Sequence, residues 1–263
     1  MSPIVSGPER ELIRDRLTVR AYPDRESMGV AAAAHAAERL RSLLAQPDRR
    51  PRVIFAAAAS QAEFLDALAE SDGIDWSRVQ AFHLDEYLGL PRDDVHGFGR
   101  WLDDHIFSRV MPGRVEKMDP TAADPLAESR RYGALLADGG IDLACIGIGE
   151  NGHLAFNDPH VADFDDPEVV KPVEIDSTSR AQQVRDGAFA TIDAVPRVAM
   201  TVTMSTILAS RSITVVVPGP AKAAAVAAAL DGPISPVCPA SGLRRHPDAV
   251  LFVDALAAAG LTN

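Results

Sequence analysis

The segment Ile141–Ile148 reads IDLACIGI and runs directly into GENGHLAFNDP, residues 149–159. A short apolar run that ends at glycine is typical of a buried strand followed by a tight turn. Similar runs predict further strands at Arg52–Ala57, Val79–Leu84, Val198–Val202, Ser212–Val217 and Ala249–Val253. Strands at this spacing, with helical stretches between or after them, favour βαβ units and a mostly parallel sheet.

Helical periodicity fills the segments around these runs. Helices are predicted at Glu26–Leu44, Gln61–Glu70, Gly97–Val110, Ala123–Ala137, Ala221–Leu230 and Asp254–Ala259, and loops at 158–166 and 232–242. The chain shows no internal repeat and no linker. We therefore predict a single α/β domain over residues 1–263, an open sheet with helices on both faces.

Charge and cysteine content exclude several classes of protein. The 263 residues carry 26 Lys and Arg against 37 Asp and Glu, a formal net charge of −11. Non-specific binding to nucleic acid or to an anionic membrane needs a basic surface, so we expect neither partner. A local basic pocket for one phosphate is compatible with this net charge. Cys145 and Cys238 are too few for a disulfide framework, and no zinc-type cluster is visible.

The N-terminal residues MSPIVSGPERELIRDRL place charges before any apolar run. A secretory signal has the opposite arrangement, with a continuous apolar region. No apolar stretch reaches the roughly 20 residues that a membrane helix needs. These features predict a cytoplasmic protein.

Three predicted strands end in distinctive polar loops. They are Asp85–Gly89, Gly149–Pro159 and Pro218–Lys222. Open parallel sheets bind ligands at the carboxyl ends of their strands, so we look for chemistry in these loops.

Asp85 and His153 are the candidates for proton transfer. Histidine is the residue type whose unperturbed pKa lies nearest neutrality, and Asp158, five residues further on, could orient the His153 ring. The alternative is a glycine-rich turn whose histidine only caps a helix or bonds locally. Asp85 could serve as a general base at the sheet edge, or it could cap a turn together with Glu86.

Two further strand ends could hold an anion. Lys222 follows Gly219 at a predicted helix start, where backbone N–H groups favour a phosphate; the alternative is a solvated lysine. Ser60 and Gln61 follow the strand Arg52–Ala57, and Ser60 is expected to cap the next helix, which does not exclude a phosphate there. His83 and His246 are predicted to be structural.

Two of the loops resemble signatures of the glucosamine-6-phosphate deaminase family. Residues 82–90, FHLDEYLGL, are similar to its FxMDEYxGL motif, and residues 147–159, GIGENGHLAFNDP, to GxGxDGHIAFNEP. LRRHPDA, residues 243–249, matches a late LxxHPxA segment, so the resemblance runs from about Arg52 to Asp254. The related 6-phosphogluconolactonases share GxGxDGH but neither the DEY triplet nor the AFN(E/D)P ending.

The resemblance implies a Rossmann-like sheet and a reaction without metal or organic cofactor. Glucosamine 6-phosphate is ring-opened, isomerised from aldose to ketose, and loses ammonia to give fructose 6-phosphate. By position, Asp85 would move the proton from C2 to C1 and His153 the ring-opening proton at O5. Asp158 would assist His153 and is one methylene shorter than the family's Glu. Asn151 stands where an acid is frequent and would orient His153.

The resemblance also implies a substrate-binding set. Lys222 would hold the phosphate together with Arg185, for which Arg180 is the competing positional match. The remaining predicted members are Ser60, Gln61, Glu86 and Gly152. The family's TGGTP turn is replaced by Ala56–Gln61, AAAASQ.

Three functions follow from these patterns. The first is an isomerising deaminase of an amino-sugar phosphate. The second is a related sugar-phosphate isomerase or a lactonase-type hydrolase, and the third a non-catalytic sugar-phosphate sensor. The DEY triplet argues against the lactonase, because a hydrolase has no carbon-bound proton to move. A homo-oligomer is expected only from its frequency among soluble enzymes.

Overall fold

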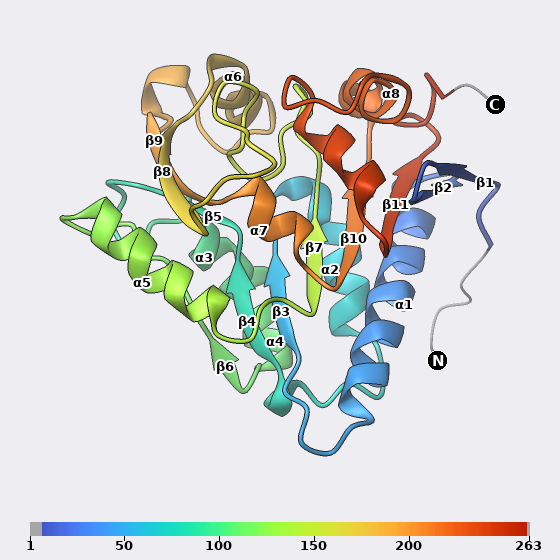
Figure 1. The fold of residues 1–263 in the computed structure, drawn as a ribbon, viewed down its shortest axis with the longest axis horizontal. Coiled ribbons are helices and arrows are strands. Elements are labelled where there is room, and N and C mark those ends of the chain that lie inside the picture. The colour runs from blue at the N-terminus through green and yellow to red at the C-terminus, as the bar shows by residue number, and fades with distance from the viewer. Residues whose placement is uncertain (1–6, 262–263) are drawn as a thin grey trace.

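The computed structural model describes residues 7–261, and its centre is a sheet of eight strands within that range (Figure 1). In spatial order the strands are β1 (Arg10–Arg14), β2 (Leu17–Tyr22), β11 (Ala249–Asp254), β10 (Ser212–Val217), β7 (Leu143–Ile146), β3 (Arg52–Phe55), β4 (Gln80–His83) and β6 (Arg114–Val115). Every pairing is parallel except the β1–β2 hairpin. The predicted mostly parallel sheet is confirmed.

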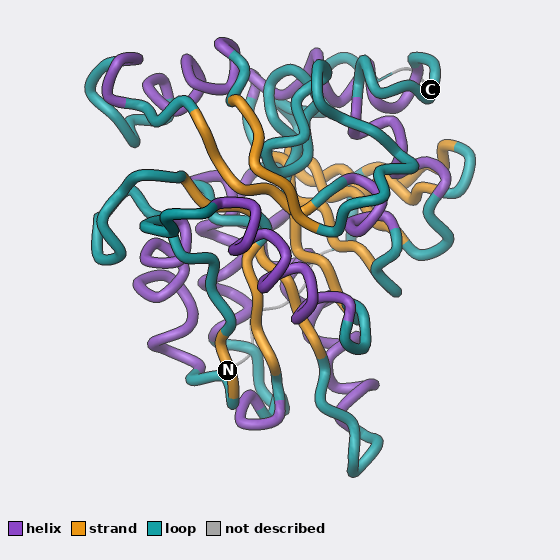
Figure 2. Tube along the Cα trace, turned by 60° about the vertical axis from the view of Figure 1, so that its left-hand side comes forward, coloured by secondary structure: helices purple, strands orange, loops and turns teal. Residues whose placement is uncertain are grey.

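Helices pack on both faces of this sheet, and Figure 2 shows the strands lying between them. The helices are α1 (Arg25–Leu44), α2 (Ala62–Ala69), α3 (Phe98–Leu102), α4 (Ser108–Val110), α5 (Pro125–Ala137), α6 (Ser177–Arg185), α7 (Met204–Leu208) and α8 (Ala223–Asp231). A π-helical turn, Asp103–Phe107, joins α3 to α4 within the predicted helix 97–110.

Alternation along the buried strands divides the core into two layers. In β3, Val53 and Phe55 pack with α1 and α2, whereas Ile54 packs on the opposite side, in the layer that includes Tyr132 of α5. The same alternation along β10 and β11 explains why these strands read as continuous apolar runs, because both faces are covered.

A second sheet holds three strands, β5 (Asp85–Tyr87), β9 (Val198–Val202) and β8 (Val170–Glu174), all antiparallel. The predicted strand Val198–Val202 is confirmed, but it belongs to this small sheet and not to the parallel one. The predicted loop 85–89 is wrong at its start, where residues 85–87 form the strand β5. A triplet of two acids and a tyrosine carries no strand pattern by itself, so only the partner β9 makes Asp85–Tyr87 extended.

The predicted helix Asp254–Ala259 is also wrong, since this segment forms turns. Asp254 accepts the Ala257 N–H at 2.7 Å and also the Gly219 N–H, with its two carboxylate oxygens at 3.0 and 2.9 Å. The aspartate thus ties the end of β11 to the loop after β10, and Gly260, next to the predicted segment, disfavours a helix there.

The strand order creates a crevice beside β3. After β3 the chain moves outward to β4 and β6, and it then returns to place β7 on the other side of β3. Parallel sheets bind ligands where the order reverses in this way. None of the helices in the described residues combines the length and apolar character that crossing a bilayer requires.

Candidate active site

A cavity opens at the carboxyl ends of β3, β4, β7 and β10. Five of the predicted site residues line it, namely Asp85, His153, Ser60, Gln61 and Lys222. They come from segments up to 162 positions apart, 222 − 60 in the numbering. An acid and an imidazole that follow different strand ends, Asp85 and His153, thus share one cavity.

Asp85 sits at the point where the chain leaves the main sheet for the small one. The Leu84 N–H still donates to Phe55 of β3 at 3.1 Å, whereas Asp85 pairs with Thr201 of β9. The carboxyl group is buried, and this burial, together with the adjacent Glu86 charge, raises the pKa of Asp85 well above its ordinary value.

The imidazole of His153 is held at Nδ1 by three oxygens. Asn151 Oδ1 lies 2.7 Å away, Ser179 Oγ 2.9 Å and Asp158 Oδ1 3.1 Å. Asn151 Nδ2 donates to Asp158, which fixes its Oδ1 as an acceptor. Nδ1 therefore carries the hydrogen, and Nε2 of the neutral ring is the lone-pair nitrogen, the form that accepts a proton.

Asp158 lies behind His153 and has no exposed surface. Burial alone would raise the pKa of Asp158, but hydrogen bonds from His153, Asn151 and Ser179 and the attraction of His153 lower it to about 2. Its other oxygen accepts the Asp176 N–H at 2.9 Å, at the start of α6. The carboxylate is thus a fixed anion that orients the ring without lining the cavity.

Gly149 makes room for the imidazole. A Cβ at this position would lie 2.1 Å from Cε1 and 2.2 Å from Nε2 of His153. The ring therefore packs directly on the Gly149 backbone, which only glycine permits. Gly152 has another role, because its φ of +84° turns the loop and its carbonyl accepts the Ala240 N–H at 2.8 Å.

Strand β9 holds both halves of the site. Asp85 pairs with Thr201, and the Phe156 N–H donates to Thr201 Oγ1 at 3.1 Å. Asn157 Nδ2 donates to the Val202 carbonyl at 2.8 Å. The 149–159 loop and the Asp85 strand are therefore both attached to Thr201 of β9.

Lys222 is the buried cation of the cavity, with 8% of its surface exposed. Burial lowers the pKa of Lys222, Asp186 and Glu150 oppose this, and Arg185 adds to it. Lys222 is the last residue before α8, so the predicted position at a helix start is confirmed. An anion here would face a cation and the N–H groups of that helix.

The two candidate arginines have different surroundings. Arg185 forms an ion pair with Glu150, and half of its side chain, 51%, is exposed. Arg180 donates to the carbonyls of Ile192 and Val195, so it fastens the loop after α6. Arg185 is thus the arginine that lies near Lys222, although it does not line the cavity.

Glu86 and Ser60 are bound by local contacts. The Glu86 carboxylate accepts the N–H groups of Tyr87, Phe98 and Gly99 at 2.9–3.0 Å and so anchors the start of α3 outside the cavity. Ser60 caps no helix, contrary to expectation, because it lies inside the 3-10 turn Ala59–Gln61. Its Oγ instead accepts from Gln61 Nε2 at 3.3 Å.

Sequence reasoning missed several members of the site. Gln182 and Gln183 of α6 line the cavity, as do Phe98 and Phe156. Ser179 bonds both Asp158 and His153. The one local signal was Asp176, a good N-cap residue that accepts the Thr178 N–H at 2.7 Å and marks the start of α6. Within residues 7–261, no group of three or more His, Cys, Asp or Glu is placed to hold a metal ion.

Comparison with known proteins identifies the relatives of this chain. The model of the glucosamine-6-phosphate isomerase/6-phosphogluconolactonase family matches residues 23–252. A glucosamine-6-phosphate deaminase of Exiguobacterium sibiricum is 35% identical over 192 residues, which cover 73% of this chain and 74% of the relative. One from Bacillus velezensis is 37% identical over 193 residues, 72% of this chain and 78% of the relative.

Solved structures share the fold. A structure described as a monomeric glucosamine-6-phosphate deaminase superposes with a TM-score of 0.83 and 29% identity, over 92% of this chain and 99% of the other. A 6-phosphogluconolactonase of Thermotoga maritima gives a TM-score of 0.72 at 19% identity, over 90% and 99%. The second likeness concerns the fold alone.

The contact between Gly149 and His153 predicts the effect of one methyl group. Gly149→Ala should displace the imidazole by about 1 Å and reduce turnover at this site about 100-fold, since catalysis is that sensitive to geometry. Steady-state rates of the folded variant test this. Gly7→Ala is the control, because a Cβ there meets nothing within 4 Å. Wild-type rates in Gly149→Ala would contradict the placement of the ring.

The pKa of Asp158 predicts a pH-dependent stability. A carboxyl that titrates at about 2 in the folded chain and near 4 unfolded stabilises the fold above about pH 4, and this contribution disappears as the pH falls to about 2. Asp158→Asn should therefore lower the free energy of unfolding by about 2 kcal/mol at neutral pH. Urea unfolding at several pH values, with exposed Asp165→Asn as control, should show the difference shrinking below about pH 4.

Proposed function

We propose that this chain, which belongs to the glucosamine-6-phosphate isomerase/6-phosphogluconolactonase family, isomerises and deaminates an amino-sugar phosphate. The substrates are glucosamine 6-phosphate and water, and the products are fructose 6-phosphate and ammonia. The family resemblance predicted from the motifs is confirmed by the match over residues 23–252. The observation that carries the proposal is the cavity shared by Asp85, His153 and Lys222.

Ring opening and isomerisation each need a proton transfer, and the site offers one group for each; water then adds at C2 and ammonia leaves. His153 Nε2 takes the proton of the C1 hydroxyl and delivers it to O5 as the C1–O5 bond breaks, while Asn151, Ser179 and Asp158 hold Nδ1–H. Asp85 takes the proton from C2 and delivers it to C1. A single carboxylate serves both carbons because they are adjacent, and its raised pKa brings it nearer to the working pH.

Asn151 and Asp158 together compensate for the departures from the family pattern. The Asp158 carboxylate reaches within 3.1 Å of His153 Nδ1 despite its shorter side chain. Asn151 bridges the two, since its Oδ1 accepts from His153 and its Nδ2 donates to Asp158 at 2.9 Å. The imidazolium formed in ring opening thus faces a fixed negative charge, which supports catalysis rather than mere binding.

We propose that the phosphate group of the substrate binds Lys222 and Arg185. Lys222 is buried and lines the cavity, and Arg185 lies close enough to lower its pKa. Arg185 would exchange its ion pair with Glu150 for the phosphate, a modest cost because an exposed pair contributes about 1 kcal/mol or less. Binding at this end orients the sugar carbons against Asp85 and His153.

The domain organisation, location and partners of the protein are also proposals. We propose one domain over the whole chain, a cytoplasmic location and a small sugar phosphate as the only partner, without nucleic acid or membrane. The net charge of −11 supports the last two exclusions. A homo-oligomer stays a prediction, and one solved relative is described as monomeric.

A hydrolase of sugar-phosphate lactones is the second candidate, because 6-phosphogluconolactonases share the fold. Hydrolysis leaves every carbon-bound hydrogen in place, whereas aldose–ketose isomerisation passes one through the Asp85 carboxyl, where it can exchange with solvent before it reaches C1. In D₂O, the product of an isomerase carries deuterium at C1 and that of a lactonase carries none. A non-catalytic sensor would bind the sugar phosphate and leave it unchanged.

Turnover of glucosamine 6-phosphate tests the proposal directly. The wild-type protein should release ammonia and fructose 6-phosphate in equal amounts, and Asp85→Asn should reduce the rate by at least about 100-fold, because no other group is proposed for the C2 proton. Ammonia is measured by a coupled assay and the ketose by chromatography.

The control separates catalysis from folding. A buried carboxyl with a raised pKa destabilises the folded chain above the unfolded pKa of about 4, so Asp85→Asn should have the higher thermal midpoint at neutral pH. Equal turnover by the wild type and this more stable variant would reject the deaminase.

The raised pKa of Asp85 predicts the acid limit of activity. The base acts only when ionised, so kcat/KM should rise with pH through a midpoint well above 4, the value of an ordinary aspartate. The substrate phosphate itself titrates near 6. Substrate binding to Asp85→Asn, measured across the same pH range, gives the contribution of the phosphate, which is then subtracted. A remaining midpoint at about 4 would contradict the assignment of Asp85 as the base.

A further inference from the structure

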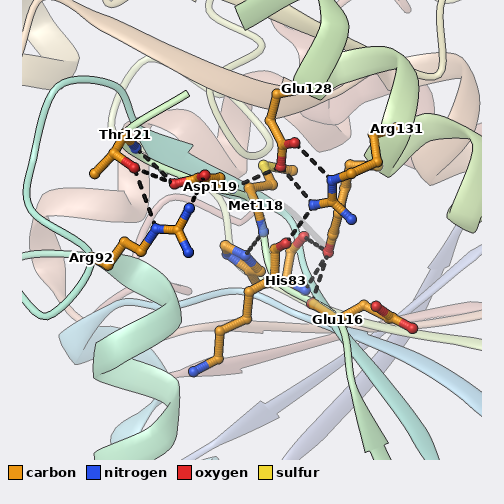
Figure 3. A network of polar contacts seen from close by, with 10 residues as sticks. His83, Arg92, Glu116, Met118, Asp119, Thr121, Glu128 and Arg131 are labelled. Carbon is orange, nitrogen blue, oxygen red and sulfur yellow. Dashed lines mark hydrogen bonds and ion pairs between the residues drawn. The ribbon is translucent and has the colours of Figure 1, made fainter. Parts of the chain in front are cut away.

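His83 is a buried histidine, 1% exposed, whose ring is bonded on both sides. The Met118 N–H donates to Nε2 at 2.9 Å, and Nδ1 lies 2.8 Å from the carbonyl oxygen of Asp85. Figure 3 shows the ring among the residues of this network, with Met118 on one side. A backbone N–H can only donate, so Nε2 is the acceptor and the ring hydrogen sits on Nδ1. The ring therefore donates to Asp85.

The surroundings keep this imidazole neutral. Burial is the largest effect, the hydrogen bond to Asp85 opposes it, and the charge of Lys117 adds to it, so that the pKa of His83 falls to about 4. Tyr132 fixes the backbone of the same residue, since its Oη accepts the His83 N–H and donates to the His83 carbonyl, both at 2.9 Å. Met118 and Asp85 thus fix the tautomer of the ring, and Tyr132 fixes the backbone that carries it.

The ring spans the corner at which the chain changes sheets. His83 is the last residue of β4, and Asp85 is the first residue of β5. Between them, the Leu84 carbonyl accepts the Val202 N–H at 2.8 Å. The His83 side chain bridges this corner and joins it to Met118, which lies outside both sheets.

We propose that His83 is a positioning residue for Asp85, because its Nδ1–H holds the Asp85 carbonyl and so sets the direction of the carboxylate in the cavity. The inference rests on the proposed role of Asp85 as the base. His83 does not line the cavity, and the phosphate-binding cation Lys222 belongs to another strand end. Its loss should therefore lower kcat and leave KM nearly unchanged.

Two amide variants separate the two ring nitrogens. In His83→Asn, the amide nitrogen is as many bonds from Cα as Nδ1 is, so the donor to Asp85 is kept and the acceptor for Met118 is lost. His83→Gln extends further and keeps a group near the Nε2 position instead. His83→Leu removes both bonds while filling most of the space.

The kinetic outcomes follow from that design. His83→Leu should lower kcat about 100-fold, the effect of a shift of about 1 Å in a catalytic group. His83→Asn should recover at least tenfold of this loss and His83→Gln should not, with KM within threefold of wild type in all three. Equal rates for Asn and Gln variants, or a kcat unchanged in folded His83→Leu, would overturn the proposal.

A second measurement does not depend on turnover. Nitrogen NMR of labelled histidines should report a protonated Nδ1 and a free Nε2 for His83. His246 provides an internal control, because its Nδ1 accepts the Asp248 N–H at 3.0 Å and its Nε2 lies 2.7 Å from the Ser210 carbonyl, the opposite tautomer. A protonated Nε2 on His83 would overturn the proposal even if glucosamine 6-phosphate is not the substrate, whereas absence of turnover with the expected tautomer would count against the proposed function alone.

Discussion

Because β7 enters the sheet on the far side of β3 from β4, the carboxyl ends of these parallel strands diverge around a crevice. The loops that leave β3, β4, β7 and β10 all line the cavity at that point. The right-handed connections between parallel strands place helices on both faces, so the core can be apolar while polar groups gather at one edge. The position of Asp85, His153 and Lys222 follows from this strand order.

Two buried aspartates in this crevice have opposite environments. Asp85 is buried and has an acidic neighbour, so its pKa is raised, whereas Asp158 receives hydrogen bonds from three side chains and has a pKa of about 2. Environments that push the pKa values of two carboxyls apart in this way suit them to different tasks. In the proposed reaction, Asp85 would take up and release a proton, and Asp158 would stay ionised beside a charged imidazole.

The small sheet converts two separate loops into one site. Thr201 pairs with Asp85 and bonds the loop that carries His153, so β9 sets the spacing between the proposed base and the proposed acid. Asn157 adds a bond to Val202 of the same strand, and the His83 ring bonds the Asp85 carbonyl. Several polar residues of the motifs FHLDEY and AFND thus support a few proposed reacting groups rather than react themselves.

Buried apolar runs and helical periodicity are local signals. They were enough to predict the parallel sheet, most of its strands and helices, and the strand ends where Asp85, His153 and Lys222 lie. The sequence by itself did not determine that Asp85–Tyr87 is a strand, that Val198–Val202 belongs to a second sheet, or that residues 254–259 form turns, since each depends on a distant partner: β9, β5 and Gly219. The roles of Ser179 and the two glutamines of α6 could not be predicted for the same reason.

The tautomers of His153 and His83 depend on tertiary contacts. The position of the proton on each ring is set by the donor or acceptor that faces each nitrogen. These partners include Asn151 and Met118, which the fold brings close to the rings.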